Sequence, residues 1–397
     1  MSLDFDGLMF SRLSVGKYSK DGEFMEGETM IGDFTFFAPT KIIFGKGCVR
    51  KNKDIITKFG KKAYIITYNI PGKHYALDDV KAIFDEAGIT YIVDTDIEEN
   101  PSMETVERAA NIGKKNKVDF MVGIGGGSPI DAAKAIGVLI QNPAKSAVDL
   151  FAGEQLKSLP LLAIPTTAGT GAEVAHWAVL TRNDMGTKQA ISPRIFPDIA
   201  FVDADYLMKM PIRLTRATAL DALCHNIESY VSTAGNYFSR SICEIAFRLF
   251  SECVEAMKKD DYTYEIREKQ MLISVIGGLV NTQTGSCLPH GMSYALTHNK
   301  KIPHGLACAL LEKEYLAIFK NTEKIDRIMT LTGFSSLNEF GAFIDSLLEL
   351  NIKVTEEEME EYATEFAAQK HRFTRHPEPA GKAEVLQIYR NSLLKYN

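Results

Sequence analysis

The sequence lacks the features that would place the protein in a membrane, in a secretory pathway or on a nucleic acid. It has no run of about eighteen or more apolar residues, so we expect no membrane span. Its start lacks the basic-then-apolar pattern of a secretion signal. No block of Lys or Arg is present and the net charge is -6, which argues against a nucleic-acid surface. We therefore expect a cytoplasmic protein whose partner is a small molecule.

Paired cysteines are lacking as well. The six cysteines are scattered along the chain, and none forms a C-x-x-C pair. This usage is typical of reduced thiols in the cytoplasm and argues against a disulfide framework. The length of 397 residues predicts two domains, or one large one, with a substantial core.

Alternating apolar runs and helical patterns predict an α/β region in the first half of the chain. Residues 1–32 show little periodicity, and we interpret them as an N-terminal extension, either a mobile tail or an edge strand. From residue 33 onward, short apolar runs such as DFMVGIGGG and PLLAIPTT alternate with helical patterns such as SMETVERAANIGKKNK. Strands that alternate with helices form βαβ units around a parallel sheet. Residues 33–203 are therefore predicted to form a Rossmann-like domain.

The second half of the chain has a different pattern. After about residue 204, strand-like runs give way to long helical patterns such as LTRATALDALCHNIESYVST and YFSRSICEIAFRLFSECVEAMKK. We expect residues 204–397 to form an all-helical domain.

A glycine-rich stretch, VDFMVGIGGGSPIDAAKAIG, predicts a phosphate site. A strand runs into Gly125, Gly126 and Gly127, and we expect Ser128 to cap the helix that follows. Three glycines let a phosphate approach the backbone, and the N–H groups at a helix start favour an anion. Ser128 replaces the last glycine of the usual Rossmann spacing, so a tight turn without a ligand stays open as the alternative.

Three of the eight histidines lie in one short window, LPHGMSYALTHNKKIPHG. Two of them, His290 and His304, stand in PHG motifs. Upstream, Asp221 and His225 are four residues apart, which places both on one face of a helix. One carboxylate and three imidazoles would suit Fe²⁺ or Zn²⁺. Each of these residues could instead be an ordinary polar residue of a helix.

Five motifs occur in the order found in iron-containing (group III) alcohol dehydrogenases, which this sequence resembles over roughly residues 33–397. They are GGGSPIDAAKAIG, IPTTAGTGAEV, PDIAFVDADYLMKMP, ALDALCHNIESYVS and PHGMSYALTHNKKIPHG. The resemblance implies a dinucleotide-binding α/β domain followed by a helical metal-binding domain. It also implies reversible, NAD(P)-linked hydride transfer between nicotinamide and a primary alcohol or short hydroxy acid.

The resemblance assigns a role to particular residues. The metal ligands fall on Asp221, His225, His290 and His304, with Fe²⁺ as the implied metal and Zn²⁺ as the alternative. The dinucleotide contacts fall on a glycine loop, a threonine-rich loop and three further positions: Asn100, Gly125, Gly126, Gly127, Ser128, Asp131, Thr166, Thr167, Thr170 and Lys188. A homo-oligomer, with a dimer favoured, is implied as well.

Tyr294 departs from the family pattern. It stands where the family often has a second histidine close to substrate and nicotinamide, and a phenol is a poorer base at pH 7 than an imidazole. We expect Tyr294, or His298 one turn further on, to carry the catalytic proton, although His298 could equally face solvent. Members resembling 4-hydroxybutyrate dehydrogenase share this tyrosine, which favours a short hydroxy acid. Arg372 and Arg375 are candidate partners for its carboxylate, or surface charges.

Tyr68 is the second departure, because NAD-preferring members often have an Asp at its position. Without that carboxylate a 2′-phosphate meets no repulsion, and Lys73 could pair with it. We therefore expect NAD or NADP with a slight preference for NADP. The alternative functions are a lyase resembling dehydroquinate synthase, which uses the same two-domain plan, and a non-catalytic protein that keeps the fold.

Overall fold

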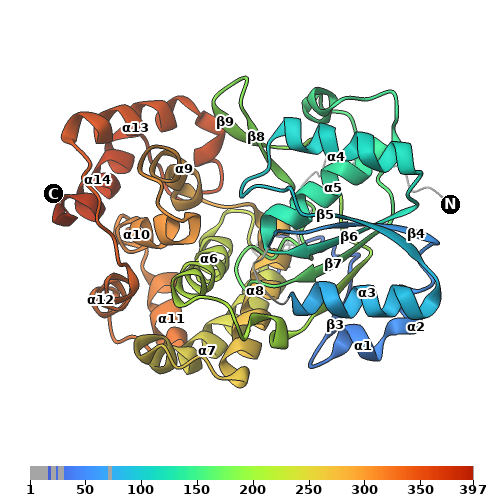
Figure 1. Cartoon of the computed structure of the whole chain (residues 1–397). Helices are drawn as coiled ribbons and strands as arrows, with labels where there is room; N and C mark the ends of the chain where they lie inside the picture. Colours follow the sequence, from blue (N-terminus) through green and yellow to red (C-terminus); the bar gives the residue numbers. More distant parts are fainter. Residues whose placement is uncertain (1–16, 19–23, 26–30, 70–73, 397) are drawn as a thin grey trace.

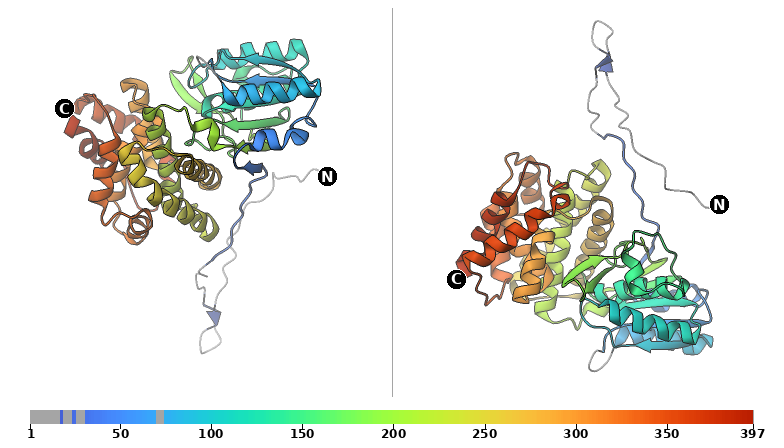
Figure 2. Two further views of the ribbon diagram at one scale, coloured as in Figure 1. Left: turned by 60° about the horizontal axis from the view of Figure 1, so that its bottom comes forward. Right: turned by 90° about the horizontal axis from the view of Figure 1, so that it is seen from above.

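The computed structural model describes residues 17–18, 24–25, 31–69 and 74–396. Most of the predicted extension at residues 1–32 lies outside these ranges, as does Lys73. Within them, β1 (Lys17–Tyr18) and β2 (Phe24–Met25) pair as an antiparallel ribbon that stands away from the rest of the chain (Figure 2).

A parallel six-stranded sheet forms the first half of the protein, as predicted (Figure 1). Its strand order is β3-β10-β7-β6-β4-β5, and every neighbouring pair is parallel. The strands are β3 (Lys41–Phe44), β4 (Lys62–Ile66), β5 (Thr90–Asp94), β6 (Phe120–Gly125), β7 (Leu161–Pro165) and β10 (Ile199–Val202). β6 and β7 are buried along their whole length, as their continuous apolar sequences predict.

Helices cover both faces of this sheet. α4 (Met103–Asn116) and α5 (Gly127–Gln141) pack on the face that carries Tyr64 and Ile66. α1 (Cys48–Lys51), α2 (Lys53–Ile56) and α3 (Tyr75–Ala87) pack on the opposite face. Alternate residues of β4 thus enter two separate cores, which is the arrangement of a doubly wound sheet. A 3₁₀ turn, η1 (Ala147–Phe151), lies between α5 and β7. A short hairpin of β8 (Val179–Arg182) and β9 (Thr187–Ala190) follows β7.

The second half of the described chain is helical, as predicted, and packs around α6 (Ile212–Val231). Nearly every residue in the last four turns of α6 is buried. The other long helices are α7 (Tyr237–Lys259), α8 (Tyr264–Thr284), α9 (Leu288–Lys300), α10 (His304–Ala317), α11 (Glu323–Thr332), α12 (Leu337–Leu347), α13 (Glu356–Ala368) and α14 (Lys382–Leu393). Three 3₁₀ turns complete this half: η2 (Ala204–Leu207), η3 (Lys370–Phe373) and η4 (Leu394–Tyr396). The division into two domains at residues 203 and 204 stays a prediction.

No single helix in the described ranges has the length and hydropathy of a membrane span. Only α8 and α9 taken together reach those values, and they are bent by 109° relative to each other.

Candidate active site

Four side chains from three helices bring potential metal-donor atoms together. Asp221 comes from α6, His290 from α9, and His304 and Cys308 from α10. One donor atom of each lies within 4.8 Å of the donor atoms of the other three. The Asp221 Oδ1 atom is 3.6 Å from His290 Nε2 and 3.9 Å from His304 Nε2.

The close approach of α10 to α6 depends on Gly305. A Cβ atom at Gly305 would lie 2.0 Å from the Ala217 carbonyl oxygen and 2.7 Å from Asp221 Cβ. Any side chain there would push the two helices apart. Because α10 begins at His304, the glycine that follows lets the start of this helix press against α6. His304 is thereby carried to Asp221.

The donor group fits a divalent cation. The Asp221 and His290 side chains are each only 5% exposed, and their Oδ1 and Nε2 atoms make no hydrogen bond. Buried polar atoms without a partner are costly, and a cation between them would remove that cost. Burial lowers the pKa of His304 to about 3, so its ring is neutral, as a metal ligand requires.

His225 lies beside this group, and its donor atoms are not within the 4.8 Å cluster. Its ring stacks on that of His290 with the centroids 4.3 Å apart, and its Nδ1 atom is buried without a partner. The structure thus brings together Asp221, His290 and His304 and adds Cys308, which the sequence reasoning missed. The signal was there: Cys308 follows His304 by four residues, one turn of a helix.

The glycine loop lies at the carboxyl end of β6, in contact with the threonine-rich loop that follows β7. A Cβ atom at Gly126 would meet Thr167 Oγ1 at 3.1 Å, and one at Gly127 would meet Thr170 Cγ2 at 3.0 Å. Thr166 is tied to the same loop, because its N–H donates to the Gly125 carbonyl at 2.9 Å. The two loops therefore form one backbone-lined edge.

Ser128 does not cap α5, contrary to the prediction. The helix begins at Gly127, and Gly126 occupies the capping position. The Ser128 hydroxyl instead accepts the N–H of Asn100 at 3.0 Å. The bond to this neighbouring segment replaces the local capping bond, while the N-terminus of α5 still points into the loop.

Asn100 and Lys188 meet beside the glycine loop. Asn100 Oδ1 accepts from Lys188 Nζ at 2.9 Å, and the Asn100 backbone has a positive φ of 58°. Burial lowers the pKa of Lys188, and its positive charge contributes to the low pKa of His304. Lys188 is therefore linked to the glycine loop through Asn100, and its positive charge is close enough to the donor group to lower the pKa of His304.

Asp131 is held by the hairpin that follows the threonine-rich loop. Its Oδ2 atom accepts the Val179 N–H at 2.9 Å, and its Oδ1 atom is 3.7 Å from the buried Lys134 ammonium. Burial raises the pKa of Asp131 to about 6. The described contacts of Asp131 thus fasten α5 to β8.

The threonine-rich loop also contacts the helical half of the protein. A Cβ atom at Gly169 would lie 2.8 Å from Thr218 Cβ on α6. Gly171 has a φ of 62°, and a Cβ atom there would lie 2.4 Å from Gly278 Cα on α8. Only glycine permits these approaches. The loop therefore couples the edge of the sheet to the helices that carry the donor group.

The two predicted catalytic residues lie in different surroundings. The Tyr294 ring centroid is 5.7 Å from that of His304, and the Arg372 guanidinium carbon is 5.4 Å from the Tyr294 ring centroid. His298 is exposed near the end of α9, and among the described residues no hydrogen bond, ion pair or ring contact joins it to the donor group. The structure thus places Tyr294, and not His298, beside the donors.

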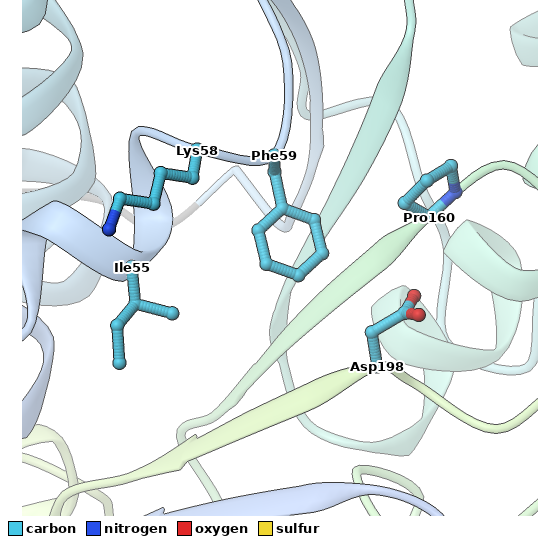
Figure 3. A pocket seen from close by; sticks show the side chains of 5 residues that line it. All are labelled: Ile55, Lys58, Phe59, Pro160 and Asp198. Carbon is cyan, nitrogen blue, oxygen red and sulfur yellow. The ribbon is translucent and has the colours of Figure 1, made fainter.

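A surface hollow at the amino edge of the sheet is separate from the donor group and the glycine loop (Figure 3). It is lined by Ile55, Lys58, Phe59, Pro160 and Asp198. Pro160 and Asp198 immediately precede β7 and β10, so the hollow lies at the amino edge of the sheet, opposite the glycine loop. Ligands of open α/β sheets bind at the carboxyl edge. The Asp198 carboxylate is already occupied, because its Oδ2 atom accepts the Leu161 N–H at 2.8 Å.

Two family models match the sequence. Residues 39–204 match iron-containing alcohol dehydrogenase, and residues 215–393 match the C-terminal part of the Fe-containing alcohol dehydrogenase family. Together they cover most of the chain. The protein belongs to the iron-containing alcohol dehydrogenase family.

Individual family members agree with this assignment. An NADPH-dependent butanol dehydrogenase from Clostridium saccharobutylicum is 32% identical over 325 residues, which are 79% of this chain and 82% of that protein. A lactaldehyde reductase from Escherichia coli strain K12 is 32% identical over 68% of this chain and 71% of its own length. The crystal structure of an iron-containing alcohol dehydrogenase from Thermotoga maritima has a TM-score of 0.84 and 33% identity, and covers 91% of this chain and 99% of that one.

The family membership confirms the predicted enzyme class, a metal-dependent, NAD(P)-linked alcohol dehydrogenase. The matched models and the relatives named above are dehydrogenases and a reductase, so the lyase alternative is not favoured. The roles of the individual site residues stay predictions.

Proposed function

We propose that the enzyme interconverts a short primary alcohol or hydroxy acid and its aldehyde at the junction of sheet and helices. The observation that carries this proposal is the pair of buried atoms Asp221 Oδ1 and His290 Nε2, which lie 3.6 Å apart and make no hydrogen bond. With His225 and His304 they form the proposed metal-ligand set. When bound, a divalent cation supplies Lewis acidity toward the substrate oxygen, and nicotinamide supplies the hydride acceptor.

The chain's own residues hold the ligands in place and exchange the proton. The His225 and His290 rings are stacked, so each limits the rotation of the other. Tyr294 has a hydroxyl that can give or take a proton and lies next to His304, whereas His298 is exposed. We therefore propose Tyr294 as the group that exchanges the alcohol proton with solvent. His298 remains the alternative only if α9 moves.

The dinucleotide is proposed to lie along the glycine and threonine-rich loops. Its pyrophosphate would sit at the N-terminus of α5, against Gly125, Gly126, Gly127 and Ser128. Thr167 and Thr170 pack closely on Gly126 and Gly127, which supports this placement of the pyrophosphate. Side chains at the two glycines would occupy the space between the two loops. Thr166, Asn100 and Lys188 continue the same edge, and Asp131 acts by fixing it to β8.

We propose NADP as the preferred dinucleotide. Tyr68 follows β4 at the carboxyl edge of the sheet. It stands at the position where an Asp would bind the ribose 2′-hydroxyl of NAD, so this position carries no carboxylate. Burial raises the pKa of Tyr68 to about 12, so its phenol is neutral and adds no repulsion against a 2′-phosphate.

We propose a substrate that carries a carboxylate. The Arg372 guanidinium is partly exposed and lies over the ring of Tyr294, which in turn is beside His304. Its Nε atom donates to Gln369 Oε1 at 3.2 Å, and its two terminal nitrogens are on the outer side of the fork. A guanidinium so placed can bind a carboxylate in a two-pronged manner. Arg375 is exposed, and its carbonyl oxygen accepts the Thr233 N–H, so it is the weaker candidate.

We also propose that the enzyme acts in the cytoplasm as a homodimer. All six cysteines are free and buried, which suits a reducing compartment. Exposed Phe34 stacks on exposed Phe238 of α7 with the ring centroids 6.0 Å apart, and this apolar pair supports association with a second copy. Light scattering of the purified protein would give the mass directly.

The decisive experiment is metal-dependent turnover. Apo-protein is loaded anaerobically with Fe²⁺ or Zn²⁺ and assayed at the nicotinamide band with short alcohols, diols and 4-hydroxybutyrate, and with the matching aldehydes. Turnover that is lost in His290→Ala and His304→Ala supports the proposal. Bound metal and bound cofactor without turnover for any pair would refute it.

A further inference from the structure

Two basic side chains lie side by side where the end of α6 meets the start of α11, away from the donor group. The Lys324 Nζ atom donates to the Val231 carbonyl at a long 3.5 Å. The Arg240 Nε atom donates to the Tyr230 carbonyl at 3.1 Å, and its Nη2 atom to the Ser232 carbonyl at 3.4 Å. Among the described residues, neither cation forms an ion pair. Three consecutive carbonyls of α6 therefore hold two like charges together without a carboxylate to neutralise them.

The Lys324 amine borders a second surface hollow, with a volume of about 430 Å³. This size lies within the range of small-molecule sites. Lys324 is half-buried, so a small solute can reach it from solvent. The other cation of the lining, Arg327, is already held by both carboxylate oxygens of Glu244. The lining consists of Tyr230, Glu323, Lys324, Asp326, Arg327 and Thr330.

The surroundings of Lys324 disfavour its charged form. Burial, followed by the positive charge of Arg240, lowers the pKa of Lys324 to about 8, although Cys287 and Glu323 act in the opposite direction. Lys324 is also the second residue of α11, where the positive end of the helix dipole disfavours a cation. With this pKa, roughly a quarter of the amine is neutral at about pH 7.5. The neutral amine is the form that attacks carbonyl carbons.

We infer that Lys324 is a site of reversible aldehyde capture, where its amine and a small neutral aldehyde form an imine in the hollow. The nitrogen lone pair attacks the carbonyl carbon and forms the C–N bond. The aldehyde oxygen then leaves as water with the two amine hydrogens, so nothing is oxidised or reduced. The enzyme class established above supplies the aldehyde, and the inference depends neither on the metal ligands nor on the proposed substrate.

The charges around the hollow favour a neutral adduct over an anionic one. An imine removes the like charge that the ammonium places beside Arg240. A carbamate, formed from carbon dioxide, would be attracted by Arg240. It would, however, face the carbonyl oxygens at the end of α6 and the carboxylates of Glu323 and Asp326, which line the same hollow.

The test traps the imine. Purified full-length protein is incubated at about pH 7.5 with propionaldehyde and sodium cyanoborohydride, which reduces an imine to a stable secondary amine. The labelled lysines are then quantified by peptide mass spectrometry at short times. Lys320 is the internal control, because it is exposed four residues before Lys324. Arg240→Gln removes the neighbouring charge and keeps a group that can donate to the α6 carbonyls.

Lys324 should be labelled at least about tenfold faster than Lys320. Its labelling rate should level off above about pH 8, and Arg240→Gln should slow it at about pH 7.5 because the like charge is gone. Without the reductant, dialysis should restore the unmodified mass. Labelling of Lys324 in wild type no faster than that of Lys320 overturns the inference, even if Arg240→Gln fails to fold. An equal or faster rate in folded Arg240→Gln also overturns it. None of these readings requires turnover, so they are independent of the proposed metal site.

Discussion

The carboxyl group of Glu228 on α6 accepts a hydrogen bond from Nδ1 of His290 on α9, and both side chains are buried. This bond orients the His290 ring, so that its Nε2 atom faces Asp221 Oδ1 at 3.6 Å. The second Glu228 oxygen accepts the Cys287 N–H at the start of α9. One carboxylate therefore holds both the ring of His290 and the beginning of the helix that carries it.

Replacing Glu228 should weaken metal binding. In Glu228→Gln, one amide oxygen must serve two N–H donors, so one of the two bonds is lost and the His290 ring is no longer held by a charge. We expect metal affinity to fall by roughly 10–100-fold, measured by chelator competition. The kcat at saturating metal should fall less.

Glu312→Gln is the matched control, because Glu312 is equally buried on the neighbouring helix α10. Burial raises the pKa of Glu312 well above its ordinary value, so its carboxyl group is neutral. Replacing it with an amide, which is also neutral, therefore leaves the net charge of the site unchanged. Equal losses of metal affinity in the two variants would show that the Glu228–His290 bond has no special role.

Much of the fold could be predicted from the sequence because the local patterns agree with the packing. The continuous apolar runs at Phe120–Gly125 and Leu161–Pro165 became fully buried strands. Pro303 lies between α9 and α10, where the fixed geometry of a proline in the sequence predicts that a helix is interrupted.

The parts that could not be predicted depend on contacts between distant segments. Ser128 has the chemistry of a helix cap, yet its hydroxyl is used by Asn100, 28 residues away. Glu228 looks like any helical glutamate until α9 packs beside it. Cys308 could have been suspected from its spacing to His304, but only the approach of α10 to α6 at Gly305 brings its sulfur to Asp221.

Glu173, in the threonine-rich loop, should make the protein less stable as the pH rises. Burial raises its pKa from 4.5 to about 7, while Lys134 opposes the shift; the same Lys134 ammonium also interacts with Asp131 and His176. Between these values the folded protein keeps a proton that the unfolded chain releases. Stability therefore falls across this window by on the order of 3 kcal/mol and is level above it.

Glu173→Gln should remove this dependence, because the amide does not titrate. Thermal midpoints of both proteins, measured from about pH 4.5 to about pH 7.5, would check it: the wild type loses stability relative to the variant as the pH rises. The exposed Glu154→Gln serves as the control and should follow the wild type. Parallel curves for wild type and Glu173→Gln would mean that Glu173 is ionised throughout.

Lys188 should contribute to cofactor binding more than to chemistry. Lys188→Ala removes the ammonium that contacts Asn100 at 2.9 Å beside the glycine loop. We expect the KM for the dinucleotide to rise about tenfold, with a smaller change in kcat. Lys115→Ala is the control, because Lys115 is exposed in the last turn of α4, at the opposite edge of the sheet. A change confined to kcat would contradict a binding role.

Tyr68 should set the choice between the two dinucleotides. In Tyr68→Asp, a carboxylate can accept the ribose 2′-hydroxyl of NAD and repels the 2′-phosphate of NADP. The ratio of kcat/KM for NADPH over NADH should fall by at least about tenfold. Tyr68→Phe keeps the ring without a charge and should leave the ratio near that of wild type. If both variants shift the ratio equally, the effect comes from lost packing.

Arg372 should distinguish acidic from neutral substrates. In Arg372→Ala, the KM for 4-hydroxybutyrate or its semialdehyde should rise by at least about tenfold, because a charge-assisted hydrogen bond is lost. The KM for an uncharged alcohol of similar length should change little. Arg372→Lys keeps the charge without the fork and should recover part of the affinity. The neighbouring Arg375→Ala is the control, since Arg375 is exposed and its backbone contacts do not need the side chain. Equal effects of Arg372→Ala on acidic and neutral substrates would show that Arg372 supports the Tyr294 ring and does not read the carboxylate.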